Sequence, residues 1–438
     1  MDVYYILCFL AAIAIMIAYL NQYINKVQTT IAITAGALIC SLGIILAGQF
    51  GWFRLESIAQ GVVQQINFQN FLLKGILGFL LFAGALGIKL PVLKDQKWEI
   101  TVLSLFSTLF STFLIGFATY GVTHLIGINM ALIHCLLFGA LISPTDPIAV
   151  LAIIKKLNAP RRVSMQVEGE SLFNDGVGLV IFVTIFAVSF GGRSPTLMDV
   201  SSVFLHEALG GVVYGLVIGY IAHLLICATD DGSLEQLITL LVPTAGFALA
   251  NMLGVSGALA MVVAGIMVGN WTRYKGFSEQ SAHYLDHFWE MIDHFLNALL
   301  FLLIGLCLLL IDLSREGIIL MLLAIPVCLL ARYISVAVPF IAFRFFRTYN
   351  PYTLKILTWG GLRGGLALAM ALSIPAGAAF IPGTQTDVRD LILVMTYAVV
   401  LFSILVQGSS IESMIIKSKR VEPSKSEHQH PSIEHGHH

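Results

Sequence analysis

Long apolar runs recur along the whole chain and are separated by short polar segments. Most runs are close to the length that an α-helix needs to cross a hydrocarbon core about 30 Å thick. The pattern predicts about 13 membrane-spanning helices. They are expected at residues 2–20, 29–48, 68–88, 98–126, 130–156, 168–190, 204–228, 233–252, 255–270, 284–312, 316–343, 352–376 and 387–415. The predicted fold class is therefore an all-α polytopic membrane protein.

Lysine and arginine are distributed unevenly over the polar segments. Of the 24 basic residues, 17 lie in the segments that follow odd-numbered spans, whereas the other loops hold only Arg54, Arg193, Arg315 and Arg389. Cytoplasmic loops are enriched in Lys and Arg, so this asymmetry predicts an N-terminus outside the cell and a C-terminus inside. Residues 416–438 are polar, and we expect them to form a disordered cytoplasmic tail.

The composition excludes several classes of protein. Apolar residues make up 58% of the 438 residues and charged residues only 11%, against about 25% charged residues in a soluble domain. The net charge of −1 provides no basic surface that would bind nucleic acid. All six cysteines lie within apolar runs, at spacings that do not suggest a metal site. We therefore expect a membrane protein that has no soluble enzymatic module, is not an enzyme and carries no cofactor.

Two prolines interrupt the fifth predicted span. In the sequence SPTDPIAV, Pro144 and Pro147 flank Thr145 and Asp146. Each proline removes a backbone donor and clashes with the preceding turn, so we expect the helix to break and to leave free carbonyl groups beside a carboxylate. Pro147 suits the first position of a second half-helix, with Asp146 as its N-cap. A simple proline kink with a capping aspartate is the alternative interpretation.

The sixth span carries ionisable and polar side chains within an apolar helix. Its sequence GESLFNDGVGLVIF contains Glu170, Ser171, Asn174 and Asp175. An ionisable side chain at bilayer depth is costly and therefore indicates function. Ser171 and Asp175 are one turn apart on one face, and Glu170 and Asn174 lie on the neighbouring face. We expect both faces to contact protein or a water-filled cavity.

The twelfth span contains an arginine among glycines. In GGLRGGLALA, Arg363 is surrounded by Gly360, Gly361, Gly364 and Gly365. These glycines allow the backbone to unwind, and the arginine can reach a carboxylate or the carbonyl end of a half-helix. Close helix packing is the alternative explanation for the glycines. Two interrupted helices, one in each half of the chain, indicate a binding site at the membrane midplane of a secondary transporter.

These three motifs, in this order and in a chain with this span pattern, resemble the sodium/proton exchanger superfamily, and most closely the bacterial NhaP-type antiporters. The resemblance extends to residue 415 and implies a homodimer in the inner cell membrane, with inverted repeats and two crossed, discontinuous helices. It implies one transmembrane antiporter domain over residues 1–415. Within it, residues 98–190 and 316–415 would form a core, and residues 1–97 and 204–312 a dimerisation part.

The resemblance also implies a cation site between the fifth and sixth spans. Asp146 and Asp175 would hold the cation, and Ser171 and the Thr145 backbone would add oxygen ligands, which suit a hard cation such as Na+ or Li+. Two carboxylates in a poorly hydrated cavity do not both ionise easily without a counter-ion, so protons and the cation compete for the site. Relatives with an Asn-Asp pair, here Asn174 and Asp175, are associated with electroneutral exchange.

Other implied residues are structural. The resemblance pairs Glu170 with Arg363, which would hold the broken twelfth span to the sixth, and Arg332 matches a second arginine of the family. Ala83 stands in the third span, where many relatives carry an acidic residue. A K+/H+ antiporter of the same fold and an acid-lined cation channel remain as alternatives, and the physiological purpose could be salt tolerance or pH homeostasis.

Overall fold

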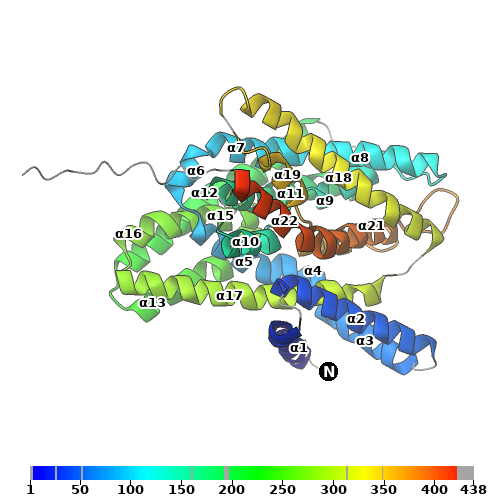
Figure 1. Ribbon diagram of the computed structural model, residues 1–438, viewed down its shortest axis with the longest axis horizontal. Coiled ribbons are helices and arrows are strands. Elements are labelled where there is room, and N and C mark those ends of the chain that lie inside the picture. Colours follow the sequence, from blue (N-terminus) through cyan, green and yellow to red (C-terminus); the bar gives the residue numbers. More distant parts are fainter. Residues whose placement is uncertain are drawn as a thin grey trace, which may run out of the picture.

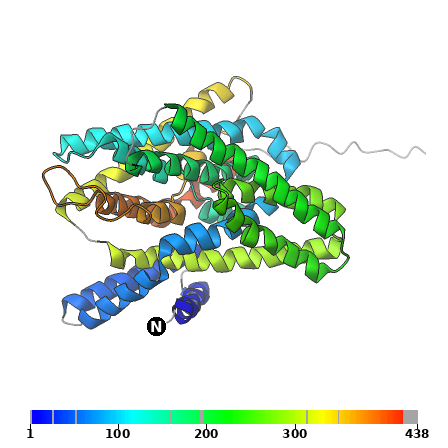
Figure 2. The same ribbon diagram turned by 180° about the vertical axis from the view of Figure 1, so that it is seen from behind.

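The computed structural model describes residues 3–24, 27–50, 53–158, 161–191, 197–311, 314–347 and 349–421. These residues form an all-helical protein in which long helices pack side by side (Figures 1 and 2). Ten of the helices are long and apolar enough to cross a membrane. Of the predicted tail, residues 422–438 lie outside the described residues.

Most helices coincide with the predicted spans. The first half of the chain forms α1 Val3–Ile24, α2 Thr29–Gln49, α3 Phe53–Ile66, α4 Phe68–Asn70, α5 Leu77–Gly87, α6 Leu90–Asp95, α7 Lys97–Thr101, α8 Ser107–Leu125, α9 Leu132–Ile142, α10 Ile148–Lys156 and α11 Arg161–Phe190. The second half forms α12 Leu197–Cys227, α13 Gly232–Leu241, α14 Phe247–Met252, α15 Gly257–Met267, α16 Arg273–Lys275, α17 Glu279–Leu306, α18 Arg315–Phe343, α19 Thr353–Trp359, α20 Gly365–Leu372, α21 Val388–Phe402 and α22 Gly408–Val421. Short π-helical turns connect α4 to α5, α7 to α8, α13 to α14, α15 to α16 and α21 to α22.

The structure departs from the predicted spans at several points. The predicted loop between residues 48 and 68 contains α3, which packs beside α2 (Figure 1) and ends where Asn67 adopts a left-handed conformation. The last helix continues through Val421, beyond the predicted boundary at residue 415. Spans 130–156 and 352–376 are each divided into two short helices, and the ten long apolar helices do not include span 255–270.

The helices pack in two groups that meet at the interrupted helices. In one group α5 packs on α15, α15 on α12, and α2 on α17, while in the other α8 packs on α9 and on α18, and α18 on α21. Gly269, in the turn that follows α15, allows this segment to lie close against α5, since a Cβ at this position would collide with the carbonyl group of Leu86. The short helix α20 is buried and packs on helices of both groups. The division into a core and a dimerisation part stays a prediction.

Candidate functional site

The two interrupted helices touch each other in the interior of the protein. One chain segment breaks between α9 and α10 and the other between α19 and α20. The amide nitrogen of Asp146 donates a 2.8 Å hydrogen bond to the carbonyl oxygen of Leu362, which forms an isolated antiparallel bridge. A Cβ at Gly364 would collide with the Asp146 carboxylate. Glycine is therefore required there because the second break passes directly over the aspartate.

The Asp146 carboxylate lies at the start of the half-helix α10. Its Oδ1 accepts a 3.0 Å hydrogen bond from the amide nitrogen of Ile148, the first residue of α10. The N-cap position is occupied by Pro147, so the helix begins one residue later than the sequence predicted. The expected interaction is nevertheless present, because a carboxylate next to the first amides of a helix satisfies a free donor and stabilises the positive end of the helix dipole.

A buried hydrogen-bond network fixes the first break to α11. The Asn174 side chain accepts a 3.1 Å hydrogen bond from the Thr145 amide and donates a 2.9 Å hydrogen bond to the Thr145 hydroxyl. The Thr145 hydroxyl also lies 3.0 Å from the hydroxyl of Ser171. All three residues are buried. The Asn174 amide both accepts and donates in this network, whereas an ionised aspartate at this position could only accept.

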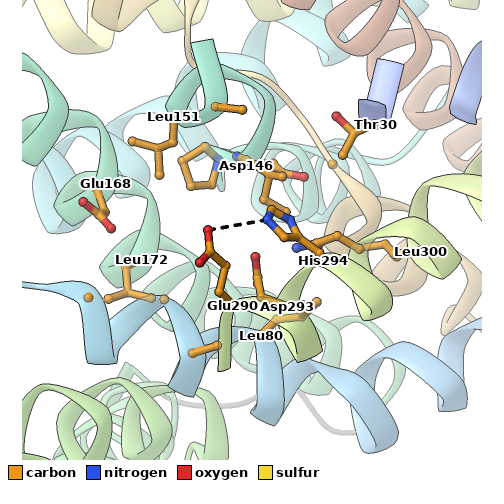
Figure 3. A pocket seen from close by; sticks show the side chains of 18 of the residues that line it. Thr30, Leu80, Asp146, Leu151, Glu168, Leu172, Glu290, Asp293, His294 and Leu300 are labelled. Atoms are coloured by element: carbon orange, nitrogen blue, oxygen red, sulfur yellow. Dashed lines mark hydrogen bonds and ion pairs between the residues drawn. The ribbon is translucent and has the colours of Figure 1, made fainter. Parts of the chain in front are cut away.

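A cavity of about 1500 Å³ reaches the two aspartates. Asp146 and Asp175 are both partly exposed and line it. The cavity lining also includes the basic residues Lys155, Lys156 and Arg273. Glu168 of α11 also lines the cavity, and Figure 3 shows it in the same pocket as Asp146.

Asp293 is an acidic residue of this cavity that the sequence analysis did not single out. Asp293 of α17 lines the cavity across from Asp146 (Figure 3). The only signal in the sequence is an ionisable residue within the predicted span 284–312. The start of this span is polar, so the sequence does not distinguish Asp293 from neighbouring side chains that are exposed to solvent.

The Arg363 guanidinium binds the carbonyl end of a half-helix and not a carboxylate. Its Nη1 donates to the carbonyl oxygen of Ser143 and, at 3.0 Å, to that of Pro144. These two carbonyl groups follow the last residue of α9. A positive charge at this position compensates both the free carbonyls and the negative end of the helix dipole.

Glu170 pairs with Arg332, so the predicted pair of Glu170 with Arg363 is wrong. The Arg332 Nη1 lies 2.5 Å from Glu170 Oε1, and both side chains are buried, with 6% and 2% of their surface exposed. A second nitrogen of Arg332 donates a 2.9 Å hydrogen bond to the carbonyl oxygen of Leu357 in α19. The guanidinium reaches this place beside Gly361, where a Cβ would come within 2.6 Å of Nε. Arg332 thus connects α18, α11 and α19.

Comparison of the sequence with known proteins identifies the family of the chain. The family model described as "Sodium/hydrogen exchanger, transmembrane" matches residues 41–417. The chain belongs to the sodium/hydrogen exchanger family. The predicted resemblance is therefore confirmed, and this exchanger is similar to the NhaP-type Na+/H+ antiporters.

Individual relatives extend the comparison over nearly the whole exchanger. The chain is 41% identical to the Na+/H+ antiporter NhaP of Pseudomonas aeruginosa over 424 residues, which cover 96% of this chain and 98% of that one. It is 30% identical over 371 residues to the Na+/H+ antiporter NhaH of Halobacillus aidingensis, covering 83% of this chain and 87% of that one. The solved sodium proton antiporter MjNhaP1 of Methanocaldococcus jannaschii superposes with a TM-score of 0.74 at 20% identity, over 94% of this chain and 97% of that one. This exchanger therefore has the fold of that antiporter.

Proposed function

We propose that this exchanger transports Na+ or Li+ against H+ by alternating access, and that Asp146 and Asp175 bind the cation and the proton in turn. The observation that supports this most directly is the position of the two carboxylates. Both face the cavity where the two interrupted helices meet. Neither carboxylate forms an ion pair with a basic side chain in the described part of the chain.

The surrounding oxygens suit a hard monovalent cation. Asp146 and Asp175 supply carboxylate oxygens, and the hydroxyls of Thr145 and Ser171 lie 3.0 Å from each other beside them. The Thr145 hydroxyl already accepts a hydrogen bond from Asn174, so it keeps a lone pair free for a cation when it donates its own hydrogen to Ser171. Oxygen ligands without thiolate or imidazole favour alkali metal ions over transition metals. Thr145 and Ser171 complete the proposed cation site.

Competition between cation and proton explains obligatory exchange. An empty site with two ionised carboxylates is poorly stabilised in a protein interior, and either a bound cation or a bound proton lowers this charge. Only loaded sites would then cross the apolar barrier between the two sides. Asn174 supplies an amide and no charge, so only the two carboxylates titrate at the site. We propose that one bound cation replaces one bound proton, which leaves the loaded site with the same charge in both forms and makes transport electroneutral.

The direction of the cavity supports an orientation in the membrane. Lys155, Lys156 and Arg273 line it, and all three belong to the basic segments assigned to the cytoplasm by the positive-inside rule. We infer a conformation that is open to the cytoplasm, with the N-terminus outside. We further propose a homodimer located in the inner cell membrane.

Proteoliposomes test the proposed function. The proton movement driven by Na+, Li+ or K+ is followed with a pH-gradient dye, with and without a permeant ion that clamps the voltage. We expect dequenching by Na+ and Li+ that is insensitive to the clamp. Dequenching that requires charge compensation would contradict electroneutral exchange, and a response to K+ alone would make the protein a K+/H+ antiporter. Cation flux without proton movement would instead indicate an acid-lined channel.

A further inference from the structure

The wall of the cavity opposite the two aspartates carries a second pair of polar residues. Asp293 and Asn297 are one helical turn apart on α17 and therefore lie on one face of that helix. Both residues line the cavity. Figure 3 shows Asp293 projecting into the space that Asp146 enters from the other side.

Asn297 is buried without a hydrogen-bond partner. Only 2% of its surface is exposed, and neither its Oδ1 nor its Nδ2 atom forms a hydrogen bond with any described residue. The amide faces the neighbouring Asp293 carboxylate, but the distance and angle between them do not reach those of a formed hydrogen bond. A buried amide without partners destabilises a protein unless something else occupies its polar atoms. A ligand in the cavity would provide that partner.

The charge of Asp293 is not compensated by an ion pair among the described residues. Two basic residues of the cavity lining, Arg273 and His294, lie beside other carboxylates. Arg273 lies 2.5 Å from Asp286, and His294 lies 3.8 Å from Glu290. The neighbouring wall from α5 is apolar. Lys155 and His294 lie near enough to act on the Asp293 carboxylate, but neither forms an ion pair with it, so a cation that enters this part of the cavity can contact the carboxylate directly.

We propose that Asp293 and Asn297 form a second cation site, which a monovalent cation occupies between the cavity mouth and the inner site at Asp146 and Asp175. The carboxylate and the amide oxygen of this vestibule site would bind the cation together with water. This inference rests on the proposed function, because it places the vestibule site on the route of the transported ion. Its effect is to raise the local concentration of cation beside Asp146.

Transport kinetics test the vestibule site through two variants and one control. Asp293→Asn and Asn297→Leu should each raise the half-saturating Na+ concentration about tenfold, which corresponds to ~1.4 kcal/mol. The maximal rate should be retained, because the inner site is intact. The control is Glu279→Gln, which removes an exposed charge from the first turn of the same helix, outside the cavity lining, and it should change the half-saturating concentration little. Ionic strength is kept constant with choline.

The outcomes separate this inference from the proposed function. If wild-type protein exchanges Na+ for H+ and the Asp293→Asn variant has an unchanged half-saturating concentration, the vestibule site is refuted and the proposed function stands. If Glu279→Gln raises the half-saturating concentration as much as Asp293→Asn does, general attraction by negative charge explains the effect and the vestibule site is refuted. If wild-type protein moves no protons, the proposed function fails.

Binding measured without transport provides a second test. In detergent, Na+ should still raise the unfolding temperature of the Asp146→Asn/Asp175→Asn double variant relative to choline, because the vestibule site remains. Adding Asp293→Asn should abolish that increase. A double variant that does not respond to Na+, or a triple variant that still responds, would overturn the proposal.

Discussion

The amide nitrogen of Asp146 donates a 2.8 Å hydrogen bond to the carbonyl oxygen of Leu362, and this bond joins the two interrupted helices. Each break leaves backbone groups without helical partners, and buried backbone groups must be paired. The hydrogen bond between Asp146 and Leu362 pairs one such backbone group from each break. The conformation of the second break therefore sets the position of the aspartate in the first.

A side chain at Gly364 should displace Asp146. Its Cβ would occupy the space of the carboxylate, so we expect Gly364→Ala to reduce the exchange rate by at least about tenfold, because small misplacements of reacting groups are costly. Gly121→Ala in α8 is the matched control, since a Cβ there meets no atom within 4 Å. The dye assay in proteoliposomes measures both variants. Equal loss in both would show that the effect does not depend on contact with Asp146.

Removal of the Asp175 carboxylate should abolish transport without unfolding the protein. Asp175 is only partly buried, at the cavity wall, and forms no ion pair with the described basic residues. We expect Asp175→Ala to show no cation-driven proton movement and an unfolding temperature close to that of the wild type. Retained exchange in a well-expressed variant would exclude Asp175 from the cation site.

The two buried arginines should differ in their effect on stability. Arg332→Ala leaves the buried carboxylate of Glu170 without its partner, which should lower the free energy of unfolding by about 3–5 kcal/mol. Arg363→Ala removes hydrogen bonds to two carbonyl groups, with an expected loss of about 1.5–3 kcal/mol. Thermal unfolding in detergent ranks the two variants.

A rescue variant provides the control for this ranking. Replacing both Arg332 and Glu170 with apolar residues should recover much of the stability lost in Arg332→Ala, since a buried ion pair is often no more stabilising than apolar packing. A larger loss in Arg363→Ala than in Arg332→Ala would contradict the pairing of Arg332 with Glu170.

Competition between proton and cation predicts a specific dependence on pH. As pH falls, protons occupy the carboxylates of Asp146 and Asp175 more fully, so more Na+ is needed to displace them. Where protonated sites predominate and one proton competes, the half-saturating Na+ concentration should rise by up to about tenfold per pH unit. The rate at saturating Na+ should change much less. Measurements with equal pH on both sides of the vesicle test this, and a half-saturating concentration independent of pH would exclude a shared site.

The sequence alone was sufficient to predict the family and the features that local chemistry controls. Apolar runs locate most helices because the bilayer fixes their length. The prolines at positions 144 and 147 predict the first break, since proline cannot continue the hydrogen-bond pattern of a helix. The glycines around Arg363 predict the second break, since glycine allows the backbone to leave the helical conformation. Helix α3 was missed because its mixed polarity is typical of a loop as well as of a short amphipathic helix.

Partners across the fold could be decided only by tertiary structure. Glu170 can in principle pair with Arg332 or with Arg363, and the choice depends on how α18 and the second break pack on α11. The place of Asp293 depends on which face α17 turns toward the cavity. Periodicity shows that residues share a helix face, but not what that face contacts. Local patterns therefore determine where the helices begin, end and break, whereas packing determines which charged groups meet.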